Sequence, residues 1–161
     1  MKERALQLSA EAWRRLPRSA RVAFIGLTNH RVPVGTIGLV HDGAGRVLLL
    51  EHRYRPTHPL GLPGGYLKKG EAPADGLRRE LREETGLEIS VEGGIFDTEY
   101  NLAGGYVALA LVARATPGPL TFSSEISGGS FMAPEEVPEA TYPWHRALIQ
   151  KWRIAQGGPG A

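Results

Sequence analysis

The sequence predicts a layered α/β or α+β fold with a mixed β-sheet, and three observations lead to this prediction. The chain has 161 residues, of which 42% are hydrophobic and 22% are charged, as in an ordinary globular domain. Short β-type segments separated by glycine-bearing turns indicate hairpins. Segments with helical periodicity stand among these strands, so helices and sheet must pack as layers.

Turn and cap signals define the elements of the first half. Ser9 suits the N-cap of a short helix that Pro17 ends, and the apolar segment that follows fits a helix or a strand. Two apolar segments flank a glycine-rich turn at residues 42–45, which predicts a hairpin. The expected elements are a helix at 9–16, a helix or strand at 18–27, strands at 32–40 and 46–54, and a turn-rich loop at 56–70.

The second half contains a helix, several strands and a final helix. Pro73 suits a first helical turn, and Gly86 suits the C′ position of the same helix. Glycine pairs at 93–94 and 104–105 predict turns between strands. The expected elements are a helix at 73–85, strands at 87–91, 95–100 and 106–115, a loop at 117–128, a short strand at 129–132, a helix at 143–155 and a flexible tail at 157–161.

The composition excludes several classes of protein. There is no cysteine, which rules out disulfides, thiolate metal sites and cysteine nucleophiles and suits a reducing cytoplasm. No apolar run approaches the roughly 20 residues of a membrane span, and no secretory signal pattern follows the first residues. We therefore expect a cytoplasmic protein with no membrane partner.

Charge is distributed unevenly along the chain. The net charge is +2, but residues 1–55 hold ten Lys and Arg against four Asp and Glu, whereas residues 56–100 hold five against nine. The basic arm is either a nucleic-acid patch or a set of scattered, solvated arginines. We expect the second, because no run of five like charges occurs.

Three carboxylates share one edge of the helix expected at 73–85. On a helical wheel, Glu80, Glu83 and Glu84 lie beside the apolar stripe that contains Leu77. Like charges at these spacings destabilise a helix by a few tenths of a kcal/mol per pair, and a single neighbouring Arg79 cannot neutralise all three. The edge is either a solvated face or a site for a hard dication, Mg²⁺ or Mn²⁺, since it offers oxygen ligands without Cys or His.

The wider spacing favours the metal site. Residues 65–87 match the pattern G-x5-E-x7-R-E-U-x-E-E-x-G-U, in which Leu81 and Leu87 supply the bulky aliphatic positions U. This pattern is the Nudix box, and the chain resembles the Nudix hydrolases. The resemblance implies a Nudix-type α/β/α sandwich with a mixed β-sheet and a loop–helix–loop catalytic motif. It also implies hydrolysis of a nucleoside diphosphate linked to another moiety.

The resemblance further implies which residues act. Arg79 would hold the carboxylates by ion pairing, and Glu71 would support the loop or accept a proton. Glu125 is either a ligand from a later loop or a solvated residue. The implied ligands of Mg²⁺ or Mn²⁺ are Glu80, Glu83, Glu84, the backbone carbonyl of Gly64, and Glu125. The general base stays open among Glu71, Glu83, Glu84 and Glu125, and our hypothesis is a bound water activated beside Glu83.

Substrate contacts are less well defined by the sequence. Arg53 and Arg55 alternate on one strand, and Lys68 lies in the box loop, so each either contacts phosphate or is solvated. Aromatic side chains would either stack on a base or fill the core; they are Tyr66, Phe96 and Tyr106. The substrate stays open among nucleoside triphosphates, oxidised nucleotides, nucleotide sugars and dinucleoside polyphosphates.

We therefore expect one Nudix domain over residues 1–156, with residues 1–30 as a helical, basic extension. The leading hypothesis is an Mg²⁺- or Mn²⁺-dependent pyrophosphohydrolase acting on a nucleotide-type small molecule. The alternatives are a catalytically weak nucleotide sensor and an RNA 5′-end pyrophosphohydrolase that uses the basic arm, including Arg14, Arg15, Arg18 and Arg21. The sequence is compatible with a homodimer but sets no oligomeric state.

Overall fold

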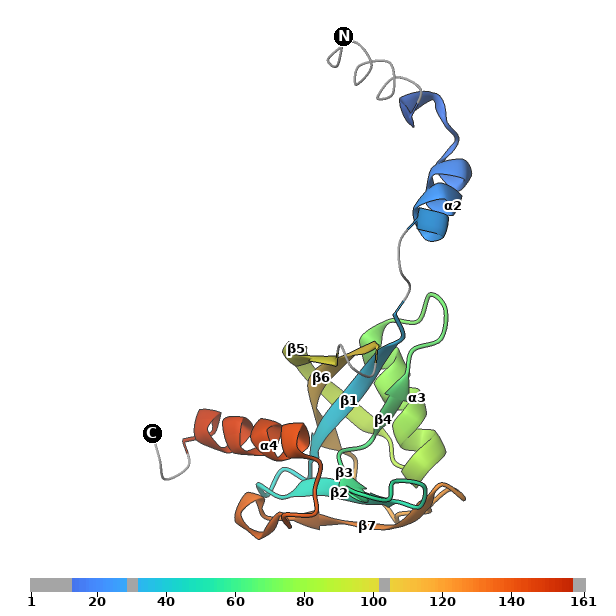
Figure 1. Cartoon of the computed structure of the whole chain (residues 1–161). Coiled ribbons are helices and arrows are strands. Elements are labelled where there is room, and N and C mark those ends of the chain that lie inside the picture. The colour runs from blue at the N-terminus through green and yellow to red at the C-terminus, as the bar shows by residue number, and fades with distance from the viewer. Residues whose placement is uncertain (1–12, 29–31, 102–104, 158–161) are drawn as a thin grey trace. The chain divides into compact units, whose positions relative to one another are not determined.

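The computed structural model describes residues 13–28, 32–101 and 105–157 (Figure 1). The chain divides into two compact units, one up to Val32 and the other from Pro33 onward. In the first unit the ambiguous segment is a helix, α2 (Arg18–Thr28). Residues 13–15 are also helical, and the rest of the helix expected at 9–16 lies outside the described residues, as does most of the expected tail.

The second unit is built on a mixed sheet. Within the described residues the sheet has seven strands, and the main order is β3-β2-β1-β6-β5, with β4 paired to β1 and β7 paired to β2. The central pair, β1 and β6, is parallel, whereas the other pairs are antiparallel. The strands are β1 (Val34–His41), β2 (Val47–His52), β3 (Leu60–Gly61), β4 (Gly64–Tyr66), β5 (Ile89–Asn101), β6 (Tyr106–Ala115) and β7 (Ile126–Met132).

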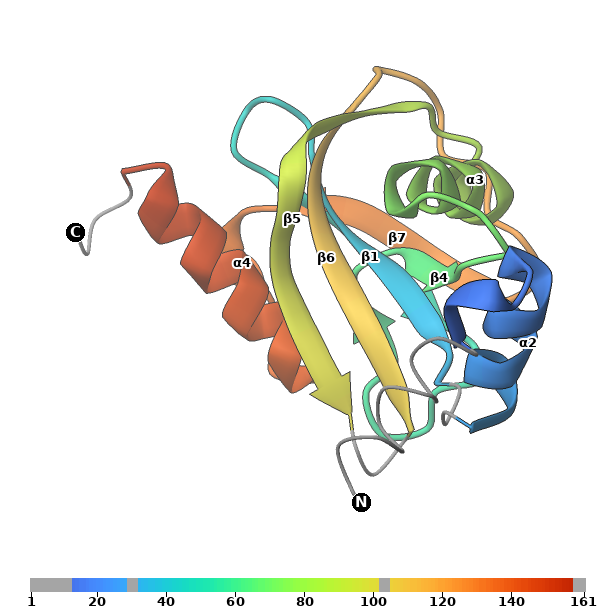
Figure 2. The ribbon, with the colours of Figure 1, turned by 90° about the horizontal axis from the view of Figure 1, so that it is seen from above.

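Helices cover both faces of this sheet. Figure 2 shows α3 (Pro73–Thr85) and α4 (Pro143–Ala155) on opposite sides of the strands, and a short 3-10 helix, η1 (Pro134–Glu136), precedes α4. Strand β2 explains the arrangement, since side chains alternate along a strand. Leu48 and Leu50 enter the core beneath α3, and Val47 and Leu49 enter the core beneath α4. The predicted α/β/α sandwich is confirmed.

Helix α3 is set closely against the sheet. As predicted, it begins at Pro73 and ends at Gly86, whose φ of 70° is left-handed and whose N–H donates to the carbonyl of Arg82. A Cβ added to Gly38 of β1 would lie 2.7 Å from a Leu77 methyl group. The absence of a side chain there lets the helix approach the strand, which fixes the height of the box carboxylates above the sheet.

Three expectations about the strands were wrong in detail. The glycine pair at 93–94 makes no turn: β5 is one strand whose pairing with β6 shifts register between Glu92 and Ile95. Strand β7 begins at Ile126, earlier than expected, because β2 pairs with it along nearly its full length. The loop expected at 56–70 contains β3 and β4, which are too short to leave a periodic signal and form through pairing with β2 and β1.

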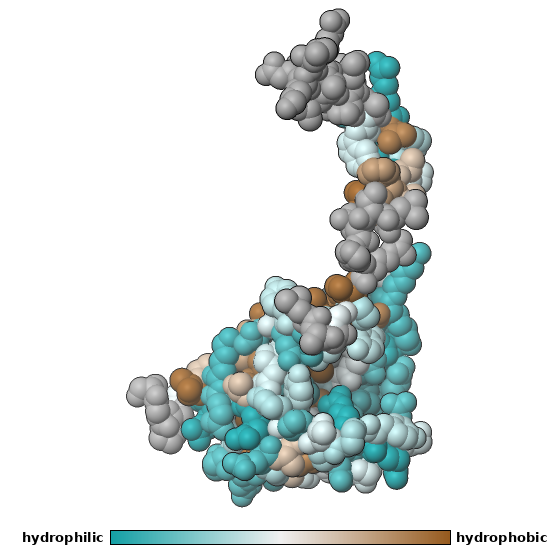
Figure 3. Space-filling view, in the orientation of Figure 1, coloured by the Kyte–Doolittle hydropathy of each residue, from teal (hydrophilic) through white to brown (hydrophobic). Residues whose placement is uncertain are grey.

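The surface of the second unit is mainly hydrophilic in the view of Figure 3. None of the helices in the described part of the chain is both long enough and apolar enough to cross a membrane.

Gly64 provides a test of the close pairing between β4 and β1. Its φ is 146°, and an added Cβ would collide with the carbonyl oxygen of Thr36. Gly64→Ala is expected to lower the free energy of unfolding by more than about 3 kcal/mol, because backbone strain and overpacking add. The matched variant Gly70→Ala has a left-handed φ of 79° but open space, so it should cost about 1–2 kcal/mol. Equal losses in urea denaturation would contradict this account.

Candidate active site

The guanidinium of Arg79 is the centre of the loop–helix site. Its Nε and one Nη donate to the two carboxylate oxygens of Glu71, at 2.8 and 2.9 Å. The other Nη donates to Glu80 at 2.6 Å and to Glu83 at 3.3 Å. A further bond, 3.1 Å long, reaches the carbonyl of Tyr66. One arginine therefore joins the box loop to the carboxylate edge of α3.

Glu71 is fully engaged by these contacts. Besides the two bonds from Arg79, it accepts the backbone N–H of Lys68 at 2.8 Å. The hydrogen bonds from Arg79 and Lys68 lower the pKa of Glu71 to about 2. A carboxylate held so firmly in its ionised form is a weak proton acceptor near neutral pH, and its contacts are those of a residue that supports the loop.

Glu84 stands in the opposite electrostatic situation. Burial raises its pKa to about 7, and the negative charges of Glu80 and Glu125 act in the same direction. The N–H of Gly64, which donates to Glu84 at 3.1 Å, and the charge of Arg55 lower the pKa without cancelling the rise. Burial, together with the neighbouring carboxylates, therefore outweighs the Gly64 N–H and Arg55, so Glu84 holds its proton more tightly than a free carboxyl does.

The box glycine has a steric function. A Cβ built on Gly65 would lie 2.5 Å from the carboxyl carbon of Glu80 and within 2.8 Å of both its oxygens. Because the glycine has no side chain, the carboxylate of Glu80 lies directly against the loop. The box spacing thus places the backbone of β4 directly against two carboxylates of α3, those of Glu80 and Glu84.

The carboxylates of the loop and of α3 offer an all-oxygen donor set. Among the residues that the structure describes, no three His, Asp or Glu side chains are gathered around one point ready for an ion, since Glu80 and Glu83 bond to Arg79. The chemistry nevertheless fits a hard dication, because every donor is an oxygen and Glu84 is buried beside two further carboxylates, Glu80 and Glu125, that also raise its pKa.

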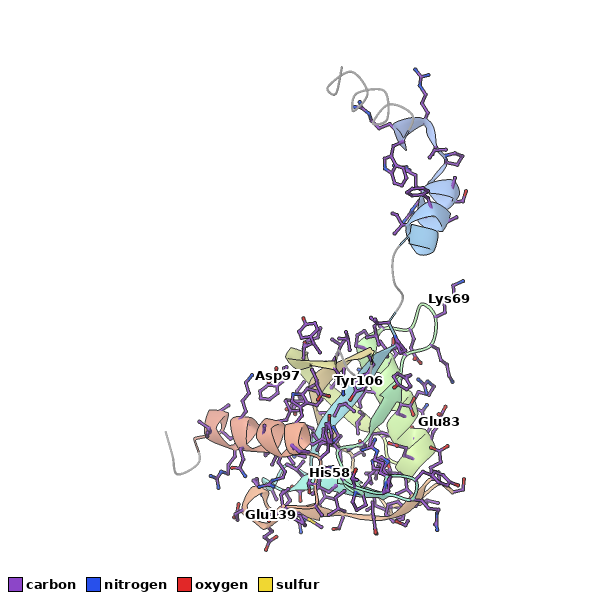
Figure 4. All side chains as sticks on the ribbon, viewed as in Figure 1. His58, Lys69, Glu83, Asp97, Tyr106 and Glu139 are labelled. Atoms are coloured by element: carbon purple, nitrogen blue, oxygen red, sulfur yellow. The ribbon has the colours of Figure 1, made fainter. Side chains whose placement is uncertain are left out.

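A cavity of about 460 Å³ opens beside the loop and α3 carboxylates. Gly64, Gly65 and Arg55 line it and also touch or face the glutamates. Tyr66 lines it too, with a side chain 59% exposed. Tyr106 also lines the cavity. In the view of Figure 4 it lies between helices α4 and α3.

The other residues expected to bind substrate lie elsewhere. Strand β2 ends before Arg53, whose Nε donates to the carbonyl of Ser124 at 3.1 Å. Its backbone N–H donates to the carbonyl of Glu125, so Arg53 holds the loop that precedes β7. Lys68 is exposed, with its Nζ 3.7 Å from Glu83. Neither Arg53 nor Lys68 lines the cavity.

Phe96 belongs to the core beneath α4, where the ammonium of Lys151 lies 5.2 Å from its ring centre. Sequence reasoning missed Glu99, Tyr142 and His145, which line the cavity with Tyr106. They come from β5 and from the start of α4, so no local spacing relates them. Side chains alternate along a strand, so Glu99 and Asp97 lie on the same face of β5. This pattern is the one sequence signal that could have suggested Glu99 as a cavity residue.

His145 is buried and His52 is half-buried, and both lie near Arg55. The Nδ1 of His145 accepts the N–H of Leu62 at 3.0 Å, and its side chain is 3% exposed. Burial lowers its pKa to about 3, with the charges of Arg55 and His52 adding to the effect. Burial and Arg55 lower the pKa of His52 to about 4. Both rings are therefore uncharged near neutral pH in the folded protein, and His145 lines the cavity.

Comparison with known proteins agrees with this site. A model of the NUDIX domain matches residues 30–152. The chain belongs to the Nudix family. As a Nudix hydrolase it acts on pyrophosphate bonds, and Nudix hydrolases generally use divalent metal ions such as Mg²⁺.

Individual relatives match different shares of the chain. A MutT-like protein of Streptomyces ambofaciens is 34% identical over 108 residues, which are 66% of this chain and 67% of that protein. The NAD-capped RNA hydrolase NudC of Mycobacterium tuberculosis is 37% identical over 59 residues, 37% of this chain and only 19% of that protein. A Nudix hydrolase structure from Nitrosomonas europaea has a TM-score of 0.72 at 15% identity, covering 81% of this chain and 76% of that one.

The buried histidines make stability depend on pH. Below pH 6.5 the unfolded chain protonates His52 and His145, which stay neutral when folded, whereas folded Glu84 keeps a proton that the unfolded chain releases. Unfolding without metal thus takes up about one net proton, and stability should fall by about 1.4 kcal/mol per pH unit between pH 6.5 and 5. His145→Asn should bring this slope close to zero.

The control for this measurement is Leu148→Ala, a buried change in the same helix. It should lower the unfolding free energy at every pH by about 2–5 kcal/mol without altering the slope. Denaturant titrations at three pH values test both variants. An unchanged slope in His145→Asn would contradict the neutral, buried state of His145.

Proposed function

We propose that the protein is an Mg²⁺- or Mn²⁺-dependent hydrolase that cleaves a phosphoanhydride bond in a nucleoside diphosphate linked to another moiety. The observation that carries the proposal is the shared wall between the carboxylate site and the 460 Å³ cavity. Arg55 and residues 64–65 belong to both. A diphosphate at this wall would have carboxylate-bound cations on one side and room for an organic group on the other.

The proposed cation ligands are Glu80, Glu83, Glu84, the carbonyl of Gly64, and Glu125. When bound, the ions would neutralise the diphosphate oxygens and lower the pKa of the attacking water. Arg79 is a positioning residue, since it fixes Glu80 and the loop at the same time. Arg55 lines the cavity close enough to Glu84 for their charges to interact, and it would pair with a phosphate oxygen.

Glu83 is the best-placed proton acceptor in this proposal. Its side chain is 55% exposed, and its contacts are weak: 3.3 Å to Arg79 and 3.7 Å to Lys68. Glu71 is tied to Arg79 by two shorter bonds and has a pKa of about 2. Glu83 therefore keeps lone pairs that can accept a hydrogen bond from a water. The ammonium of Lys68 would contact the phosphates of the substrate.

Arg53 would act at a distance from the substrate. Since its guanidinium and its N–H hold the carbonyls of Ser124 and Glu125, we assign it the task of positioning Glu125. Residues 1–156 would form one functional domain with an N-terminal extension. The chain has no cysteine, which suits a protein of the reducing cytoplasm.

The first test is Glu83→Gln, which keeps size and hydrogen bonding but removes the base. Turnover should fall at least about 100-fold, as expected for the loss of a general base, while the thermal midpoint stays near that of the wild type. Glu88→Gln is the matched control, because Glu88 is exposed on the same segment and pairs only with Arg82 among the residues described. Turnover of wild-type size in Glu83→Gln would refute the assignment.

A second test identifies the bond that is cleaved. Nucleoside triphosphates, nucleotide sugars, dinucleoside polyphosphates and an RNA with an NAD cap are assayed in ¹⁸O-water with Mg²⁺, Mn²⁺ or EDTA. We expect ¹⁸O in a phosphate product and no reaction in EDTA. The RNA arm tests the activity named for the NudC relative, which matches only 59 residues of this chain. Nucleotide binding without any hydrolysis would instead support the sensor alternative.

A further inference from the structure

Glu99 is an acidic residue inside the cavity and outside the box. It lies on β5 and is held by two tyrosines from different elements. The hydroxyl of Tyr142 donates to one carboxylate oxygen at 2.9 Å, and that of Tyr106 donates to the other at 3.2 Å. Asn101 in turn donates to the Tyr106 hydroxyl at 3.2 Å. The carboxylate is thereby fixed in orientation.

This arrangement leaves acceptor capacity unused. An ionised carboxylate has about four lone-pair sites on two oxygens, and the tyrosines occupy one site on each oxygen. Burial raises the pKa of Tyr142, and its bonds to Tyr106 and Glu99 add to the rise, so its hydroxyl remains a donor. Each oxygen of Glu99 therefore keeps a lone-pair site for one more hydrogen bond.

Within the described residues, the rest of the lining supplies one cation and several aromatic rings. Of its Arg, Lys, Asp and Glu side chains, the described lining contains Arg55 near the carboxylate site and Glu99 on β5. Aromatic rings make up much of the wall, and two of them are unusually exposed, Tyr54 at 74% and Tyr66 at 59%. Exposed rings around a cavity offer faces on which a planar heterocycle stacks.

We propose that Glu99 determines base specificity by accepting two adjacent N–H groups of a guanine ring. The inference rests on the proposed function, because the phosphates of the same nucleotide would lie at Arg55. Guanine presents N1–H and the 2-amino group side by side, and a carboxylate with one open site on each oxygen has an acceptor for both donors. Hypoxanthine presents one of these donors, whereas adenine places an acceptor, N1, where it would face the carboxylate. The expected order of affinity is guanine, hypoxanthine, adenine.

A structural role for Glu99 predicts something different. The carboxylate also ties β5 to β6 and to the residue before α4 through its tyrosine bonds. If that were its whole contribution, its replacement would weaken binding of every nucleotide by the same factor. Glu99→Gln separates the two roles, since the amide oxygen still accepts a tyrosine but its NH₂ group opposes the donors of guanine.

Calorimetric binding of GMP, IMP and AMP to the full chain without metal tests this proposal. The wild type should bind GMP about 10-fold more tightly than IMP and about 100-fold more tightly than AMP, the range for hydrogen bonds to a charged group. Glu99→Gln should lose about 10- to 100-fold in GMP affinity and change little toward AMP. The control is Glu92→Gln, which lies on the same strand but pairs with His41 outside the cavity.

Several outcomes would overturn the inference. They are equal losses for the three nucleotides in Glu99→Gln, a wild type that prefers AMP, and no nucleotide binding at all. Suppose that Glu99→Gln loses affinity equally for every base, and that the wild type binds 2′,3′-dideoxy-GMP as weakly as the variant binds GMP. Glu99 would then contact the ribose, and the inference would be overturned as well. Since binding is measured without metal, the base preference stands or falls separately from hydrolysis, whose absence in the ¹⁸O assay would refute the proposed function.

Discussion

The interaction on which the site depends is the pairing of Arg79 with carboxylates from the loop and from α3. Four hydrogen bonds from one side chain reach Glu71, Glu80 and Glu83, and a fifth reaches the loop backbone. Glu84 is not among the carboxylates that receive these bonds, and burial, with the charges of Glu80 and Glu125, raises its pKa to about 7. Arg79 thus holds in place carboxylates whose negative charges repel one another.

The sandwich around this site places it beside a cavity of mixed character. Gly38 lets α3 approach β1, and Gly64 lets β4 pair with β1, so the loop and the helix meet above the sheet centre. The cavity beside them has one cationic and one anionic contact, Arg55 and Glu99, among aromatic walls. These contacts suit a ligand that carries both an anionic group and N–H donors.

Much of the fold and the centre of the site followed from sequence because their signals are local. The box residues are related by spacing within one loop and one helix, and Pro73 and Gly86 mark the helix ends directly. The pair Glu99 and Tyr142 is separated by 43 residues and joined only by sheet and helix packing. In the same way, the course of β5 through its glycine pair follows from its pairing with β6, which no local pattern encodes.

We expect the acidic site around Glu80 and Glu84 to bind divalent cations. Calorimetric titration of Mn²⁺ into the full chain measures this directly, with Glu88→Gln as the control. We expect the wild type and Glu88→Gln to bind the ion alike, and Glu80→Gln and Glu84→Gln to bind at least about 10-fold more weakly. Absent uptake, or uptake that both glutamine variants retain unchanged, would contradict the account.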